Sequence, residues 1–268
     1  MRTLESFVKK SGGWNKFEKP VKPKTREELE EIIEDRIKRD GNKCNLNDID
    51  VSLITDMNEL FKQHIDFDGD VSEWDVSNVT SMREMFWDCR NFNCDLSKWD
   101  VSNVTDMKGV FELCDKFNSD LSKWNVSKVT DMNGMFHSCY NFNSDLSKWD
   151  VSNVTDMGSM FWDCRNFNCD LSKWDVSKVE NFEFMFAGTK KFDCNLSKWD
   201  VSNLKNCQRM FYDTVFNQDL TSWKPKDKNP ICYEMFNYKR TLRDWKFSRK
   251  MEKTNMPEFF LKKFGKYC

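Results

Sequence analysis

The sequence FWDCRNFNCDLSKWDVS occupies residues 86–102 and recurs without a change at residues 161–177. A phenylalanine recurs every 25 residues on the same register, at positions 61, 86, 111, 136, 161, 186, 211 and 236. Self-similarity at a fixed period of about 20–50 residues is typical of repeat proteins, in which each unit packs mainly against its neighbours. The period therefore predicts a solenoid of eight repeats over residues 44–236.

Tryptophan and cysteine follow the same 25-residue register. Tryptophans stand at positions 74, 99, 124, 149, 174, 199 and, one residue early, 223. One cysteine column stands at positions 89, 114, 139 and 164. Near-identical units at different places in a stack must meet similar neighbours, so we expect these columns to form a buried core rather than a cofactor site.

The apolar spacing changes partway through each repeat. Residues 99–102 alternate apolar and polar side chains, which predicts a short strand. Residues 104–114 place apolar side chains three or four positions apart, which predicts a short helix. One short parallel strand plus one short helix per repeat predicts an α/β solenoid, a leucine-rich-repeat-like horseshoe.

The two ends differ from the repeats. Residues 25–43 begin with Thr25 and Glu28, a capping box, and we expect an N-terminal helical cap there. Residues 1–24 form a basic leader with seven basic and two acidic side chains. Residues 237–268 form a basic C-terminal cap with ten basic and three acidic side chains, and residues 25–236 carry a net charge of −14. An acidic body between basic ends attracts cationic partners, although a solvated surface that keeps the stack soluble also accounts for it.

Residues 142–164, FNSDLSKWDVSNVTDMGSMFWDC, resemble the repeat of the BspA-like bacterial surface protein family. Residues 24–41, KTREELEEIIEDRIKRDG, resemble that family's N-terminal lead-in. The resemblance covers residues 24–236, and it implies a leucine-rich-repeat-like solenoid that binds other molecules, often host proteins or matrix in surface-displayed members. It also implies that there are no catalytic residues and no cofactor.

The strand face carries the main candidate site. Five aspartates and one asparagine recur there, and we expect them to align at about 4.8 Å: Asp75, Asp100, Asn125, Asp150, Asp175 and Asp200. Because aligned carboxylates repel one another, something should offset their charge. A structural ladder with a lysine column two residues away, a cationic partner and bound calcium are the three alternatives, and the lysines of that column are Lys98, Lys123, Lys148, Lys173 and Lys198.

Two further sets of residues complete the candidate surfaces. A second acidic column stands before the buried leucines, and we expect it to satisfy turn backbone. Its members are Asp70, Asp95, Asp120, Asp145, Asp170, Asn195 and Asp219. Trp87 and Trp162 lie off the tryptophan column, so they are candidates for exposed interface anchors or for packing between coils.

These patterns favour a non-enzymatic protein-binding scaffold that uses the strand face and adjoining loops. The alternative is an acidic mimic of a nucleic acid that occupies a basic partner's binding site; a third hypothesis has the basic ends binding nucleic acid or an anionic membrane. We expect a monomer with no metal, cofactor, small-molecule substrate or membrane span, and we do not expect nucleic acid as a direct ligand. Residues 1–14 lack the apolar stretch of a secretory signal, which predicts a cytoplasmic protein, whereas the family resemblance leaves display or secretion open.

Overall fold

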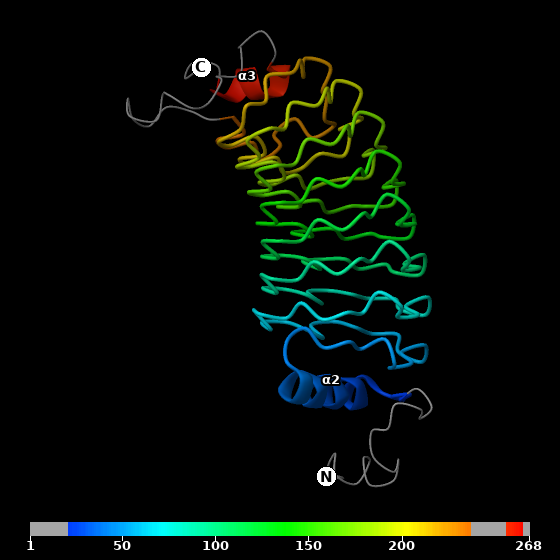
Figure 1. The fold of residues 1–268 in the computed structure, drawn as a ribbon. Coiled ribbons are helices and arrows are strands. Elements are labelled where there is room, and N and C mark those ends of the chain that lie inside the picture. Colours follow the sequence, from blue (N-terminus) through cyan, green and yellow to red (C-terminus); the bar gives the residue numbers. More distant parts are fainter. Residues whose placement is uncertain (1–20, 237–255, 265–268) are drawn as a thin grey trace.

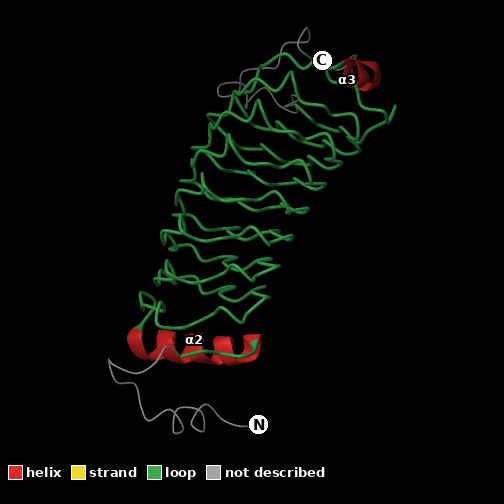
Figure 2. Cartoon of the chain, turned by 90° about the vertical axis from the view of Figure 1, so that its right-hand side faces the viewer, coloured by secondary structure: helices red, strands yellow, loops and turns green. Residues whose placement is uncertain are grey.

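The computed structural model describes residues 21–236 and 256–264, with one helix at each end of this part of the chain (Figure 1). Helix α2 spans Arg26–Asp40, and helix α3 spans Glu258–Phe264. Between them the chain winds through a stack of similar coils, which Figure 2 draws as loops. The described residues thus form a repeat protein with a 25-residue period, an aromatic core and little regular secondary structure.

Helix α2 is held at both ends by local hydrogen bonds. The Thr25 hydroxyl accepts the Glu28 N–H at 3.2 Å, and the Glu28 carboxylate accepts the Lys24 N–H at 2.7 Å. Gly41, with φ of 83°, ends the helix by donating its N–H to the Ile37 carbonyl at 2.9 Å. The side chains that α2 buries against the core include Leu29, Ile32 and Ile33.

Helix α3 contributes Phe260, whose ring packs edge-on against Phe236 with 5.1 Å between centroids. The predicted basic leader lies outside the described residues except for residues 21–24, and so does most of the predicted basic C-terminal cap. Neither helix in the described ranges is long and apolar enough to cross a membrane.

Successive coils stack in parallel and in register. Single β-bridges join residues one repeat apart, such as Asp106 to Asp131. In the core the rings of Phe111 and Phe136 lie parallel, with 5.8 Å between their centroids. Each column tryptophan donates its indole N–H to a carbonyl of the preceding coil at 2.9–3.0 Å; these residues are Trp74, Trp99, Trp124, Trp149, Trp174, Trp199 and Trp223. The aromatic columns are therefore core, as predicted.

The helix predicted for each repeat is wrong. Over residues 107–113 alternate N–H groups donate to the next coil, as Met107 does to the Asp131 carbonyl at 3.0 Å. Of the N–H groups between them, those of Val110 and Glu112 donate to carbonyls three residues back, Glu112 to that of Gly109 at 3.1 Å. The Lys108 N–H donates to the Asp106 carboxylate at 2.9 Å. A succession of turns spaces its buried side chains three or four residues apart, as a helix does, which explains why the apolar pattern was misleading.

The predicted strand at residues 99–102 is also absent, although its burial pattern is correct. Trp99 and Val101 are buried, and Asp100 is exposed. The backbone here closes turns, with the Val104 N–H donating to the Val101 carbonyl at 2.9 Å, while the Ser102 N–H donates to the Asp100 side chain. A backbone N–H that donates to a nearby side chain, as that of Ser102 does, is not available for pairing with another strand.

The cysteines are part of the packing, and none of the ten in the described residues forms a disulfide. Cys114 and its column neighbours point their thiols at buried carbonyls of the preceding coil, at 2.8–3.0 Å. Burial raises the pKa of the Cys114, Cys139 and Cys164 thiols well above the usual range. These thiols therefore stay protonated and unreactive in the folded protein.

A second cysteine position alternates with serine because both side chains accept the same backbone donor. The Ser119 hydroxyl accepts the Leu96 N–H at 2.9 Å, and the Cys169 sulfur accepts the Leu146 N–H at 3.2 Å. This shared bond explains the interchange without any disulfide or metal.

Candidate functional site

The acidic row, defined as Asp75, Asp100, Asn125, Asp150, Asp175 and Asp200, faces solvent at every position. In each member one side-chain oxygen accepts the N–H of the serine two residues on, at 2.9–3.2 Å. The resulting Asx turns fix the orientation of the side chains. Hydrogen bonds from the Ser102 hydroxyl and N–H also lower the pKa of Asp100. The side chains of the row are therefore held in place by their own turns.

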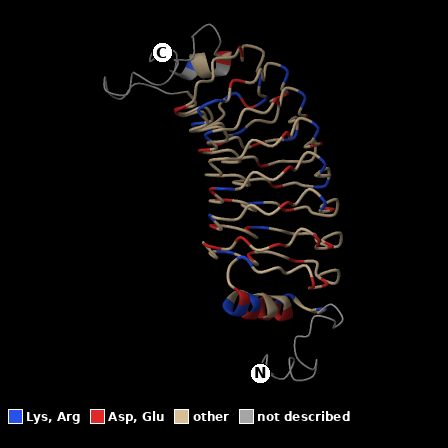
Figure 3. Ribbon diagram, viewed as in Figure 1, with Lys and Arg blue, Asp and Glu red and all other residues tan. Residues whose placement is uncertain are grey.

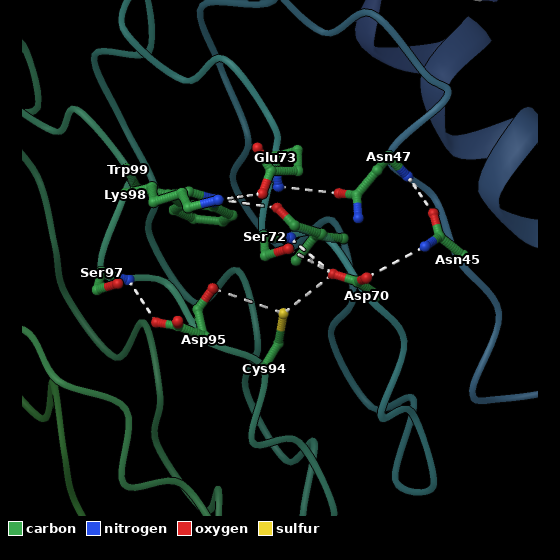
Figure 4. Close-up of polar contacts among 11 residues, drawn as sticks. Asn45, Asn47, Asp70, Ser72, Glu73, Cys94, Asp95, Ser97, Lys98 and Trp99 are labelled. Atoms are coloured by element: carbon green, nitrogen blue, oxygen red, sulfur yellow. Dashed lines mark hydrogen bonds and ion pairs between the residues drawn. The ribbon is translucent and has the colours of Figure 1, made fainter.

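The lysine column does not pair with this row, so the predicted structural ladder is wrong. No ion pair within 4.0 Å joins the row to Lys98, Lys123, Lys148, Lys173 or Lys198, all of which the structure describes and places in solvent. Lys98 instead pairs with Glu73 of the preceding coil (Figure 4). The lysine charges contribute to lowering the pKa of the second acidic column, as Lys98 does for Asp95, after the Ser97 N–H and hydroxyl.

The second acidic column satisfies turn backbone, as predicted. Its seven members accept the N–H of the residue two positions on at 2.8–3.0 Å. Figure 4 shows this for Asp70, which accepts from the Ser72 N–H and hydroxyl, from the Asn45 amide and, at 3.7 Å, from the Cys94 thiol. These side chains are thus engaged within the fold.

Sequence reasoning missed one member of the row, Asp50, which stands 25 residues before Asp75 in the atypical first coil. Its Oδ1 accepts the Ser52 N–H at 3.0 Å, as in the rest of the row, while its Oδ2 pairs with the Lys22 ammonium at 2.8 Å. Lys22 also donates to the Ser52 hydroxyl at 2.9 Å. The Lys22 bond, followed by the Ser52 hydroxyl, lowers the pKa of Asp50 to about 2. The 25-residue step from Asp75 was the signal that could have found it.

A third column of carboxylates stands six residues after members of the acidic row. Asp106, Asp131 and Asp156 follow one another through single bridges. Burial, and then the charges of Asp156 and Asp106, raise the pKa of Asp131. The described residues contain no group of three or more His, Cys, Asp or Glu side chains arranged to hold a metal ion.

The corner of each coil, defined as residues 83–91 and their equivalents one repeat apart, holds Trp87 and Trp162. Both are half-buried, and neither indole N–H has a hydrogen-bond acceptor within the described chain. The Lys62 ammonium lies 5.3 Å from the Trp87 ring centroid. Trp162 stacks between His137 and Phe184 at 4.5 and 4.7 Å. The two off-column tryptophans thus combine partial exposure with packing between coils.

Acidic and basic residues are intermixed along the stack, as the colouring of the ribbon in Figure 3 shows. In the loops beside the acidic row, the Lys128 ammonium donates to the Asn103 amide oxygen and Lys178 to that of Asn153, both at 2.6 Å. Asn103 and Asn153 in turn donate to backbone carbonyls of the preceding coil at 2.7 Å. These lysines are therefore used to join coils.

The family model described as "Mycoplasma protein of unknown function, DUF285" matches residues 28–149 and 134–245. The matched ranges include helix α2 from residue 28 onward and all the coils. The name BspA-like is not confirmed by this match and stays a prediction. No match was found among curated proteins or among solved structures.

Proposed function

This chain belongs to the DUF285 family, whose description gives no function. From the residues on its surface we propose that it is a non-enzymatic scaffold that binds a basic region of another protein. The stacked coils act as a solenoid that repeats one small binding element, a row aspartate with its serine. The acidic row, extended to Asp50, is the contact surface.

The contact between Lys22 and the first coil carries this proposal. Lys22 lies outside the repeats, and its ammonium contacts both Asp50 and Ser52. The same aspartate and serine pair recurs in five later coils, at Asp75, Asp100, Asp150, Asp175 and Asp200. No ion pair within 4.0 Å joins these five aspartates to a cation of the described chain, although the charges of Lys128 and Lys178, after hydrogen bonds from the serines, help to lower the pKa of Asp100 and Asp175. Each of these pairs can receive a lysine or arginine from a partner in the way that Asp50 and Ser52 receive Lys22.

The spacing of the row favours a protein partner over the nucleic-acid-mimic alternative. Coils joined by parallel bridges lie about 4.8 Å apart. A DNA strand carries one charge per about 3.4 Å, so the row is a sparser line of charge, and Asn125 interrupts it. A basic protein segment can match such a row with separate lysine contacts and does not need the charge density of a nucleic acid.

The experiment uses a synthetic decalysine peptide and three proteins: the wild type, a row variant and a charge-matched control. The row variant carries Asp100→Asn, Asp150→Asn and Asp175→Asn, which the natural Asn125 shows to be compatible with the turn. The control carries Asp120→Asn, Asp145→Asn and Asp170→Asn in the second acidic column, where Asn195 occurs naturally. Affinity is measured by calorimetry at two salt concentrations.

We expect the row variant to bind decalysine at least about tenfold more weakly than the control, because only the row variant loses three carboxylates of the proposed contact surface. The two variants have the same net charge. Equal affinities of the two variants would contradict the proposal, since binding would then depend on net charge alone. Competition between the protein and double-stranded DNA for one natural partner would support the mimic alternative; decalysine cannot test this, because it binds DNA itself.

A further inference from the structure

Five side chains on successive corners form one continuous stack, which we call the corner ladder. It consists of His137, Trp162, Phe184, Arg209 and Tyr212. His137 and Trp162 lie 4.5 Å apart with 7° between their planes, and Trp162 and Phe184 lie 4.7 Å apart with 18° between theirs. The Arg209 guanidinium lies 5.4 Å from the Phe184 ring centroid and 5.8 Å from that of Tyr212. The ladder therefore crosses four coils.

The fold does not require these side chains. Phe184 and Arg209 adopt φ of 55° and 53°, in the left-handed region that bulky residues rarely enter. Gly109 and Gly134 occupy the equivalent positions in other coils and make the same backbone bond to the next coil at 2.8 Å, against 2.9 Å for Phe184. Glu59, Glu84, Ser159 and Glu234 adopt the same left-handed backbone at this position in other coils. The repeat therefore accepts several residue types there, and the backbone alone does not select phenylalanine or arginine.

The ladder presents ring edges and no unpaired charge. Both faces of Trp162 are covered by its stacking neighbours. Arg209 pairs with Glu234 at 2.6 Å, and the His137 ring nitrogen contacts Glu112 at 3.0 Å. A ligand that stacks on ring faces, or one recognised by its charge, would gain little binding free energy at this surface. Ring edges are electropositive, and the Trp162 indole N–H lacks an acceptor within the described chain, so the surface suits an uncharged ligand with exposed carbonyl groups.

We propose that the corner ladder binds an extended, proline-rich segment of a partner protein. Such a segment forms a polyproline II helix, whose carbonyls make no internal hydrogen bonds and whose ordering on binding costs little entropy. Its turn of three residues rises about 9.3 Å. Two coils of the stack span about 9.6 Å, so successive turns meet successive pairs of coils. This site is separate from the acidic row and does not depend on the proposed function of that row.

The test titrates a synthetic decaproline peptide into the full chain. The readouts are the dissociation constant and the NMR signal of the Trp162 indole N–H, assigned by its loss in Trp162→Phe. We expect this signal to shift and saturate. Trp162→Ala and Phe184→Gly should each weaken binding at least about tenfold, the effect of removing an interface anchor. Trp87→Ala, an off-column tryptophan outside the ladder, should leave the affinity unchanged.

Two controls separate this proposal from the proposed function. The Asp100→Asn, Asp150→Asn and Asp175→Asn row variant should bind decaproline as the wild type does, and a Gly-Ser decamer should not shift the Trp162 signal. No shift with decaproline at millimolar concentration would overturn the proposal, and so would equal losses in Trp162→Ala and Trp87→Ala. Since both variants alter half-buried side chains, circular dichroism checks that each is folded before its affinity is compared.

Discussion

The two parts of each coil differ in how far their sequences vary. In the constant segment, residues 92–107 and their equivalents, the run DLSKWDVSNVTDM recurs with few changes, whereas three successive corners read REMFWDCRN, KGVFELCDK and NGMFHSCYN. In the constant segment, side chains hold the backbone through indole and Asx bonds. In the corner the N–H of Glu84 and that of Gly109 donate equally to the next coil, at 2.8 Å. Buried side chains recur in both parts, whereas the exposed and half-buried side chains recur in the constant segment, where they hold the backbone, and vary in the corner.

The largest effect should come from the buried stack beneath both parts. Phe136 is fully buried and stacks with Phe111, Phe142 and Phe161 at 5.8, 3.9 and 5.8 Å. We expect Phe136→Ala to lower the free energy of unfolding by about 3–5 kcal/mol. Trp162→Ala, in the corner of the neighbouring coil, should cost less, because this side chain is only half-buried. Urea denaturation of the two variants measures the difference. Equal losses of unfolding free energy would contradict the distinction between the buried stack and the half-buried corner side chain.

Tryptophans in the two parts provide a sharper comparison. Trp149 donates its indole N–H to the Leu121 carbonyl at 3.0 Å, and Leu121 is buried. Trp149→Phe should therefore lower the free energy of unfolding by about 0.5–1.5 kcal/mol, because it removes one buried hydrogen bond from a carbonyl that keeps its bond from the Trp124 N–H. Trp162→Phe should change it by about 0.5 kcal/mol or less. A larger loss in Trp162→Phe, measured by the same denaturation, would show that the corner also holds the backbone.

The Asx turns of the constant segment predict an effect that depends on the replacement. Asp100→Ala should cost about 0.5–1.5 kcal/mol, because the Ser102 N–H loses its acceptor, whereas Asp100→Asn should be nearly neutral, as Asn125 keeps the same bond. Thermal unfolding at pH 7 compares the two variants. Equal losses of stability in the two variants would mean that the Asx turn is not the reason why aspartate or asparagine occupies this position.

The smallest expected effect concerns Lys22 and Asp50. Because the folded-state pKa of Asp50, about 2, lies below that of an unfolded aspartate, the pair stabilises the fold above about pH 4 and loses this effect as the pH falls toward 2. Both side chains are partly exposed, so Lys22→Ala should cost about 0.2–1 kcal/mol at pH 6. The cost should vanish near pH 2. An unchanged cost at pH 2 would mean that Lys22 acts through packing rather than charge.

The sequence predicted the period, the core columns and the cap helix, because these depend on which side chains must be buried or capped. It did not predict the backbone of the coils. Residues 107–113 have helical apolar spacing, but their N–H groups alternate between a local turn and the next coil, and side-chain patterns do not reveal that choice. The candidate site was found in part: the row was visible from its spacing, while Asp50 was hidden in an irregular first coil. The corner ladder was not predicted, since Phe184 and Arg209 reach their neighbours only through left-handed backbone.

Native-state hydrogen exchange of the indole N–H groups tests most directly whether tryptophan side chains hold the backbone in the constant segment and do not hold it on the outer side of the corner. Trp149 and Trp162 lie only 13 residues apart, and the first donates to a buried carbonyl while the second has no acceptor in the described chain. We predict that the Trp149 indole N–H exchanges only when its coils unfold, and that the Trp162 N–H exchanges many times faster, near the rate of an exposed indole. Equal protection of the two N–H groups would contradict this division.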